Sequence, residues 1–159
     1  MRWTVLASPI GEFCVATDDT SVCGTHFGRV EAATEEPDDL LSRQAVAELR
    51  AYFAGELTAF TVPVSTPRGS VFERAVWREM TRIPYGETLT YGEVARRVGD
   101  PGAARAVGVA CNRNPVPVIV PCHRIVGAGG KLVGFGGGLP RKVKLLELEA
   151  VVALRHAWS

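Results

Sequence analysis

Closely spaced prolines constrain this chain most strongly in the run Asn114-Pro115-Val116-Pro117-Val118-Ile119-Val120-Pro121. Proline lacks a backbone N–H and disfavours helical backbone at the residue before it, so this run cannot form a helix. We therefore expect it to be extended and to deliver the next residue, Cys122, at its end. Whatever chemistry Cys122 performs depends on how this run is held.

The residues around Cys122 are those of an activated thiol. A thiol reacts as its thiolate, and an unperturbed cysteine, with a pKa of about 8.5, is mostly protonated at neutral pH. His123 and Arg124 follow directly and offer a base and a positive charge. Because neighbouring side chains need not face each other, the contact with His123 can run through a water, and a third group must orient the imidazole. Glu147 and Glu149 are the carboxylates considered for that task. A buried structural cysteine beside a surface histidine explains the same residues equally well.

The first half of the chain predicts a small α/β domain, in which turn signals and partly alternating apolar residues indicate short strands. The expected elements are strands within residues 3–27, an acidic loop over 31–39, a helix over 41–53 and a strand over 60–64. Gly55 stands where the C-terminal cap of the helix belongs. The Pro/Thr/Gly stretch 63–69 indicates a boundary between domains at 1–66 and 67–159.

The second half predicts a mostly helical domain. Helices are expected over residues 70–83, 91–98, 103–112 and 141–154. Ser70 and Glu73 have the spacing of a capping box at the first of them. The second and third helices flank the turn 99–102 and have the outline of a helix-turn-helix, although many small bundles contain such a pair. Small residues dominate the third helix and suit a close approach to a groove, with Arg105 as its long cationic side chain.

Charge is divided between the halves. Residues 1–66 carry 4 Arg/Lys against 10 Asp/Glu, whereas residues 67–159 carry 14 against 7, for a total of +1. A basic half is consistent with a polyanionic partner, or with an ordinary solvated face. No apolar run is long enough to cross a bilayer, and no export signal is visible, so we expect a cytoplasmic protein without membrane contact.

The remaining cysteines and the glycine-rich segment 127–138 suggest no cofactor. Four cysteines without a C-x-x-C pair predict neither a disulfide framework nor a zinc site, although Cys23 and His26 have the spacing of half a zinc site. Leu132 follows Lys131 where a phosphate-binding loop needs Ser or Thr, and it also interrupts the dinucleotide-binding register. We expect a flexible loop whose backbone approaches a flat ligand, with Phe135 as a wall.

Several motifs, taken in order and spacing, resemble the O6-alkylguanine-DNA alkyltransferases over roughly residues 70–150. They are Ile83-Pro84-Tyr85-Gly86-Glu87-Thr88, Thr90-Tyr91-Gly92, Ala104-Arg105-Ala106-Val107-Gly108, Asn114-Pro115, Ile119-Val120-Pro121-Cys122-His123-Arg124 and Gly134-Phe135-Gly136-Gly137-Gly138. The resemblance implies a ribonuclease H-like first domain and a winged-helix-like second one. It further implies direct reversal of DNA alkylation, in which the alkyl group from O6 of guanine, and from O4 of thymine, is transferred once to the protein.

The resemblance also implies the roles of the reacting groups. Cys122 would accept the alkyl group, and His123 would take the thiol proton through a water, with Glu149 orienting the imidazole. Tyr91 would help to turn the nucleotide out and donate its hydroxyl to the leaving guanine. The carbonyls of Cys122 and Ile125 would accept from the guanine amino group, and Gly136 would direct an N–H toward O6.

The DNA contacts follow in the same way. Arg105 would enter the duplex and fill the space of the flipped base, while Ala103, Ala106 and Gly108 would let the helix dock in the minor groove. Asn114 would brace the hinge between this helix and the active-site segment. The implied partner is double-stranded DNA carrying O6-alkylguanine, bound by a monomer, with cooperative binding left open. Phe135 departs from the tyrosine common in the family.

Three other functions compete with this one. A non-enzymatic alkyltransferase-like protein binds alkylated DNA but lacks the cysteine that stands here at position 122. A helix-turn-helix regulator would use residues 91–112 and leave Cys122 and His123 without a purpose. A cysteine hydrolase would need a histidine on another element, for which only His26 and His156 are left.

Overall fold

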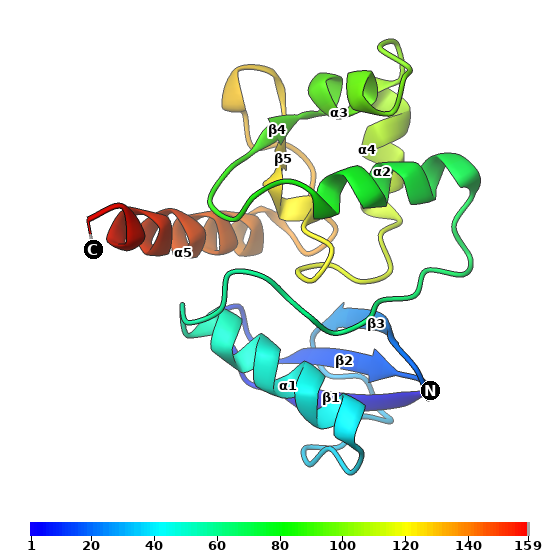
Figure 1. Cartoon of the computed structure of the whole chain (residues 1–159), viewed down its shortest axis with the longest axis vertical. Coiled ribbons are helices and arrows are strands. Elements are labelled where there is room, and N and C mark those ends of the chain that lie inside the picture. Colours follow the sequence, from blue (N-terminus) through cyan, green and yellow to red (C-terminus); the bar gives the residue numbers. More distant parts are fainter. Residues whose placement is uncertain (159) are drawn as a thin grey trace. The chain divides into compact units, whose positions relative to one another are not determined.

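A computed structural model describes residues 1–158 and divides the chain into two compact units, Met1–Thr66 and Pro67–Ser159. The N-terminal unit contains one antiparallel sheet in the order β1-β2-β3, formed by β1 (Arg2–Leu6), β2 (Phe13–Thr17) and β3 (Val22–Phe27). Helix α1 (Leu40–Phe53) packs along the sheet (Figure 1). Its buried face places the Phe53 ring edge-on to the ring of Phe13, with centroids 5.7 Å apart.

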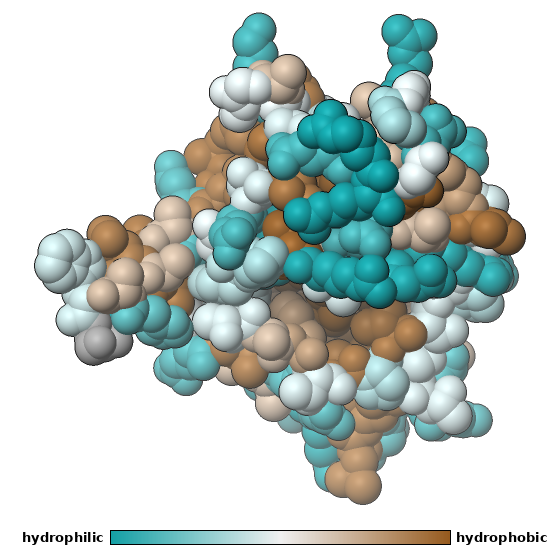
Figure 2. All heavy atoms as spheres, turned by 45° about the horizontal axis from the view of Figure 1, so that its top comes forward, coloured by the Kyte–Doolittle hydropathy of each residue, from teal (hydrophilic) through white to brown (hydrophobic). Residues whose placement is uncertain are grey.

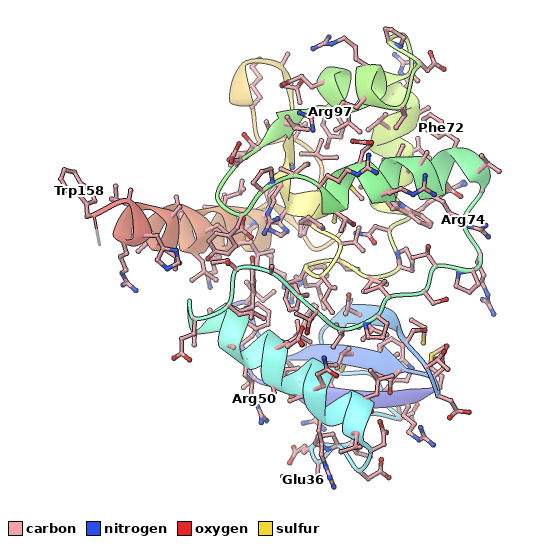
Figure 3. The ribbon with its side chains drawn as sticks, viewed as in Figure 1. Glu36, Arg50, Phe72, Arg74, Arg97 and Trp158 are labelled. Carbon is pink, nitrogen blue, oxygen red and sulfur yellow. The ribbon has the colours of Figure 1, made fainter. Side chains whose placement is uncertain are left out.

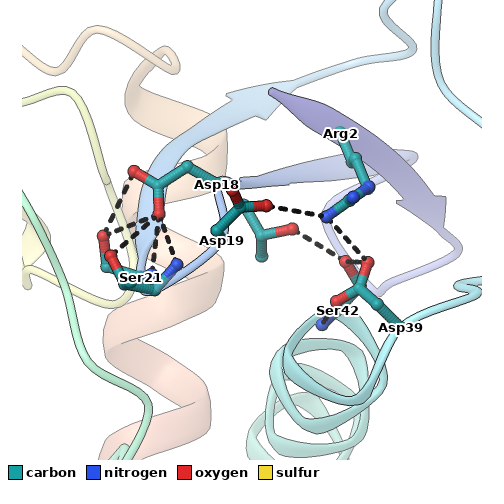
Figure 4. Close-up of polar contacts among 8 residues, drawn as sticks. Arg2, Asp18, Asp19, Ser21, Asp39 and Ser42 are labelled. Carbon is teal, nitrogen blue, oxygen red and sulfur yellow. Dashed lines mark hydrogen bonds and ion pairs between the residues drawn. The ribbon is translucent and has the colours of Figure 1, made fainter.

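Polar side chains hold the start of α1 against the sheet. Asp39 caps the helix by accepting from the Ser42 backbone N–H at 2.8 Å, and its carboxylate lies 3.6 Å from the Arg2 guanidinium (Figure 4). The buried hydroxyls of Ser42 and Thr17 are 2.7 Å apart. The other end of α1 is followed by Gly55 in the left-handed region at φ +78°, as the sequence predicted.

The prediction of a strand over residues 60–64 is wrong, because only an isolated bridge joins Val64 to Val22. The Glu48 side chain of α1 accepts from the backbone N–H groups of Thr61 (2.7 Å) and Val62 (3.3 Å). Pro63 has no N–H to contribute. The donors that a strand would use are therefore bound to a helix side chain.

The C-terminal unit consists mainly of helices, with one short pair of strands. In chain order its elements are α2 (Val71–Thr81), β4 (Leu89–Thr90), α3 (Tyr91–Arg97), α4 (Ala104–Asn112), the 3₁₀ turn η1 (Cys122–Arg124), β5 (Ile125–Val126), the 3₁₀ turn η2 (Ala128–Gly130) and α5 (Leu139–Trp158). Ser70 and Glu73 form the expected capping box of α2. Helices α3 and α4 pack together as the expected helix-turn-helix, and the fold class is confirmed.

Two contacts hold α4 and α3 within this unit. The indole Nε1–H of Trp77, on α2, donates to the carbonyl of Ala110 on α4 at 2.8 Å. Strand β4 pairs in parallel with β5, in the register Leu89 to Ile125 and Thr90 to Val126. Because α3 begins directly after β4 and β5 follows η1, this pairing brings the start of the helix-turn-helix to the segment that carries Cys122. Among residues 1–158 no helix is long and apolar enough to span a membrane.

Candidate active site

The proline-rich run before Cys122 was expected to be extended, and this prediction is wrong. The run folds back on itself, with Val118 in the left-handed region at φ +77° and the Val120 N–H donating to the Val116 carbonyl at 2.9 Å. Asn114 holds the turn through both ends of its amide, donating from Nδ2 to the Val120 carbonyl (2.8 Å) and accepting at Oδ1 from the Val116 N–H (2.9 Å). A side-chain amide thus supplies hydrogen bonds that the prolines cannot make.

Cys122 opens the 3₁₀ turn η1 directly after this fold-back and is 9% exposed. Burial raises the pKa of its thiol to about 11, although the Asn114 hydrogen bond and the Lys142 charge act in the opposite direction. At neutral pH the thiol is therefore almost entirely protonated, and it needs a base at the moment of reaction.

His123, the residue after Cys122, forms a buried pair with Glu149. Imidazole Nε2 lies 2.7 Å from Oε2 of Glu149, and both side chains are at most 1% exposed. Burial lowers the pKa of His123, so the imidazole is neutral at pH 7. Burial alone would raise the pKa of Glu149, but contacts with His123 and with Arg124 outweigh it and lower the pKa to about 2. Of the two carboxylates considered from sequence, the structure places Glu149 at the imidazole, and Glu147 is exposed.

Lys142 is a further buried member of the site that sequence reasoning missed. It is fully buried on α5, and its Nζ donates to the carbonyls of Ile125 (2.6 Å) and Val133 (3.2 Å). The ring of Phe135, half-buried on the loop before α5, has its centroid 6.0 Å from this ammonium. Lys142 lies one helical turn from Leu145 and two turns from Glu149, and therefore on the same buried face of α5. A lysine on the apolar face of a helix was the sequence signal that could have identified it.

Tyr91 begins α3 and lies against α4. A Cβ added at Gly108 would lie 3.8 Å from the Tyr91 ring, an ordinary van der Waals distance, so this part of α4 faces the ring closely without excluding a small side chain. Burial raises the pKa of the Tyr91 hydroxyl, and the thiols of Cys111 and Cys122 raise it further. Tyr91 is therefore a protonated hydroxyl at neutral pH, in electrostatic range of Cys122. Cys111 itself is buried, with its sulfur 3.7 Å from that of Met80.

The residues expected to meet DNA lie on α4 and just before it. Arg105 and Ala106 are exposed, whereas Ala103 and Gly108 are half-buried. Hydrophilic side chains gather over this unit in Figure 2, and Figure 3 marks Arg74 on α2 and Arg97 on α3 among its exposed arginines. Gly136 is exposed on the loop that precedes α5, and Ile125, in β5, is buried.

Cys23 and His26, which have the spacing of half a zinc site, both lie on β3 in the N-terminal unit. The Cys23 thiol donates to the Ala16 carbonyl at 3.7 Å, and His26 is exposed. Within residues 1–158 no three His, Cys, Asp or Glu side chains are grouped to hold a metal ion.

Comparison with known proteins finds the same relatives over both units. A family model described as the DNA binding domain of 6-O-methylguanine DNA methyltransferase matches residues 71–151, and one described as the ribonuclease-like domain of that methyltransferase matches residues 1–66. The methylated-DNA–protein-cysteine methyltransferase of Mycobacterium leprae is 56% identical over 148 residues, which cover 89% of this chain and 88% of the relative. Its counterpart in Methanosarcina acetivorans is 46% identical over 154 residues, covering 94% and 98%.

A solved structure agrees with this similarity. The crystal structure of Mycobacterium tuberculosis OGT in complex with DNA matches with a TM-score of 0.87 at 44% identity, covering 96% of this chain and 94% of that chain. The similarity therefore extends over the sheet of the first unit as well as the helices and buried site of the second.

Proposed function

The chain belongs to the 6-O-methylguanine DNA methyltransferase family, and we propose that Cys122 is the residue on which it accepts the alkyl group. Its activity is that of a methylated-DNA–protein-cysteine methyltransferase, and it acts on DNA to repair alkylation damage. The observation that carries the proposal is the buried pair of His123 and Glu149, 2.7 Å apart, directly after the buried Cys122 in the turn η1.

The chemistry at Cys122 begins with the removal of its proton. With a thiol pKa of about 11 the resting group is a poor nucleophile, and His123 takes the proton through a water as the sulfur attacks. The sulfur electron pair forms a C–S bond to the alkyl carbon, and the C–O bond to O6 of guanine breaks. The departing guanine takes the electron pair of that bond, and the Tyr91 hydroxyl neutralises it by donating a proton. A thioether has no easy route to hydrolysis, so each molecule reacts once.

Access to the base requires that the nucleotide leave the duplex. Base flipping costs a few kcal/mol, which contacts formed on flipping must offset. In our proposal α4 enters the minor groove of the damaged duplex, where Ala103, Ala106 and Gly108 permit close approach, and exposed Arg105 fills the space of the missing base. Asn114 braces the fold-back between α4 and the thiol, and Phe135 and Gly136 line the base. The protein is a monomer in solution.

Mass spectrometry of the intact protein tests the acceptor. After incubation with an oligonucleotide carrying O6-methylguanine, the wild type should gain the mass of one methylene, at most once per molecule. Cys122→Ser should gain nothing. Cys111→Ser is the matched control, because it removes the other buried cysteine of the same unit, and it should react like the wild type. Turnover beyond one equivalent, or an adduct on another residue, would contradict the proposal.

The role of Arg105 is tested by comparing two substrates. Arg105→Ala should slow repair of duplex DNA far more than reaction with free O6-benzylguanine, because only the duplex requires flipping. Arg78→Ala, an exposed arginine on α2, serves as the control and should leave both rates nearly unchanged. Equal losses on the two substrates would assign Arg105 a structural role.

A further inference from the structure

Arg124 holds the Glu149 carboxylate with a two-pronged contact inside the unit. Its Nε donates to Oε1 at 2.8 Å and its Nη2 donates to Oε2 at 3.0 Å, and the arginine is only 7% exposed. Its third donor, Nη1, binds the carbonyl of Ile83 at 2.7 Å, so the guanidinium is fixed from two sides. Planar paired contacts of this kind restrict the orientation of a carboxylate as well as its charge.

The guanidinium of Arg124 supplies a fixed positive charge that favours the ionised form of Glu149. A carboxyl group removed from water favours its neutral form unless an opposite charge or hydrogen-bond donors compensate. His123 offers a hydrogen bond but no full charge at pH 7, because burial lowers its pKa. The Gly86 backbone N–H adds a weaker donor to Oε1 at 3.2 Å. Arg124 therefore adds a fixed positive charge and two hydrogen bonds to the contacts that hold Glu149 ionised.

The protonation state of Glu149 determines where the proton of the neutral imidazole resides. An ionised carboxylate can only accept, so the imidazole must carry its proton on Nε2, and Nδ1 is then the basic nitrogen. A protonated carboxyl would instead donate to Nε2, and the imidazole proton would move to Nδ1. An imidazole in that second form has no basic nitrogen left to accept the proton of a thiol.

We propose that Arg124 is a positioning residue for the alkyl transfer, which sets the tautomer of His123 by holding Glu149 as an ionised acceptor. This inference rests on the proposed function of Cys122 and His123. Arg124 itself touches neither substrate nor sulfur in the proposal and acts only through Glu149. Lysine could supply the charge but not the paired contact, so the two features of arginine are separable by substitution.

Two other ionisable groups face this cluster. Tyr85, in the turn after α2, lies under the guanidinium, with its ring centroid 5.5 Å from Cζ. Burial raises the pKa of Tyr85 to about 12, with the Glu149 charge acting in the same direction, so it stays neutral across the pH range of interest. Lys142, on α5, is positive and opposes protonation of His123. Neither group provides an alternative negative charge for Nε2.

Nitrogen-15 NMR of the imidazole tests the proposal without any activity measurement. In the wild type at pH 7, His123 should show a protonated Nε2 and an unprotonated Nδ1. Arg124→Met, which removes the charge and keeps much of the volume, should move the proton to Nδ1 at the same pH. A wild-type imidazole protonated on Nδ1 would overturn the proposal even if the methionine variant failed to fold.

Reaction rates measured at several pH values distinguish a positioning role of Arg124 from a general loss of structure in its variants. Reaction of Arg124→Met with free O6-benzylguanine should fall by about 10²-fold at pH 7, the order contributed by a general base, and recover as Glu149 ionises at higher pH. Arg124→Lys should retain the Nε2 tautomer and most of the rate, whereas exposed Arg113→Met, the control, should match the wild type.

The positioning role of Arg124 and the acceptor role of Cys122 are contradicted by different results. A loss in Arg124→Met that is the same at every pH, with the wild-type tautomer retained, would overturn the positioning role while leaving Cys122 as acceptor. If the wild type forms no adduct on Cys122, the proposed function fails instead, and the NMR experiment still decides the tautomer.

Discussion

Replacing Glu149 with glutamine removes the charge at the centre of the buried cluster and keeps the size of the side chain. In the folded protein the carboxylate receives contacts from His123, from Arg124 and from the Gly86 N–H. Glutamine can keep one acceptor oxygen but leaves the guanidinium without a compensating charge. Breaking a buried ion pair in this way typically costs about 3–5 kcal/mol.

The lowered pKa of Glu149 gives a second, independent value for this loss of stability. Burial acting alone would raise it, yet His123 and Arg124 together lower the pKa of Glu149 from 4.5 to about 2. At about 1.4 kcal/mol per pKa unit this corresponds to roughly 3 kcal/mol of stability at neutral pH. A lowered pKa stabilises the folded state fully above pH 4.5, and this contribution is lost as the pH falls through about 2. The difference between wild type and variant should therefore be about 3 kcal/mol at pH 7 and about 2 kcal/mol at pH 3.5.

Urea denaturation of the full chain at pH 7 and pH 3.5, followed by tryptophan fluorescence, to which buried Trp77 contributes, measures this difference. Exposed Glu147→Gln, two residues away on α5, is the matched control and should change stability by less than about 0.5 kcal/mol. If the loss of stability in Glu149→Gln does not become smaller at pH 3.5, or is no larger than the loss in Glu147→Gln, Glu149 is not an ionised, buried acceptor.

Four further substitutions test the site and the elements that hold it. Lys142→Met should raise the pKa of Cys122 above about 11, since the ammonium lowers it, and slow reaction with free O6-benzylguanine at pH 7; an unchanged rate would contradict this. Thr90→Ala and Ser70→Ala each remove a capping box and should each cost about 1 kcal/mol by urea denaturation, but only the first, at the start of α3, should also slow adduct formation in mass spectrometry. Gly86→Ala should destabilise by about 1–3 kcal/mol in the same urea assay, because φ is +79° and an added Cβ would lie 2.8 Å from an α5 side chain; wild-type stability would show that this turn can relax.

Local features of the fold were predictable from sequence because local interactions produce them. The capping box of Ser70 and Glu73 joins residues three apart, and Gly55 follows the last turn of α1 in the left-handed region. The division into an α/β half and a helical half follows from apolar periodicity in the same way. The helix-turn-helix was visible from its spacing, and its resemblance to known alkyltransferases added the function.

Segments whose hydrogen bonds come from distant residues were predicted wrongly. The strand expected over 60–64 is absent because Glu48, more than ten residues earlier on α1, binds its backbone N–H groups. The run before Cys122 was expected to be extended, since proline excludes helix, yet proline does not exclude a turn. Asn114 supplies the two hydrogen bonds that hold that turn.

The sequence by itself determined that Cys122 is followed by a base and a cation, and its motifs identified the family chemistry. Only the tertiary structure decided how those groups act on one another. Folding of α5 against η1 places Glu149, and not exposed Glu147, on His123, and it buries Lys142 within electrostatic range of the thiol. The physical reason is burial. Taking these groups out of water raises the pKa of Cys122 and lowers the pKa values of His123 and Lys142, and burial depends on contacts between segments that the linear order of residues does not contain.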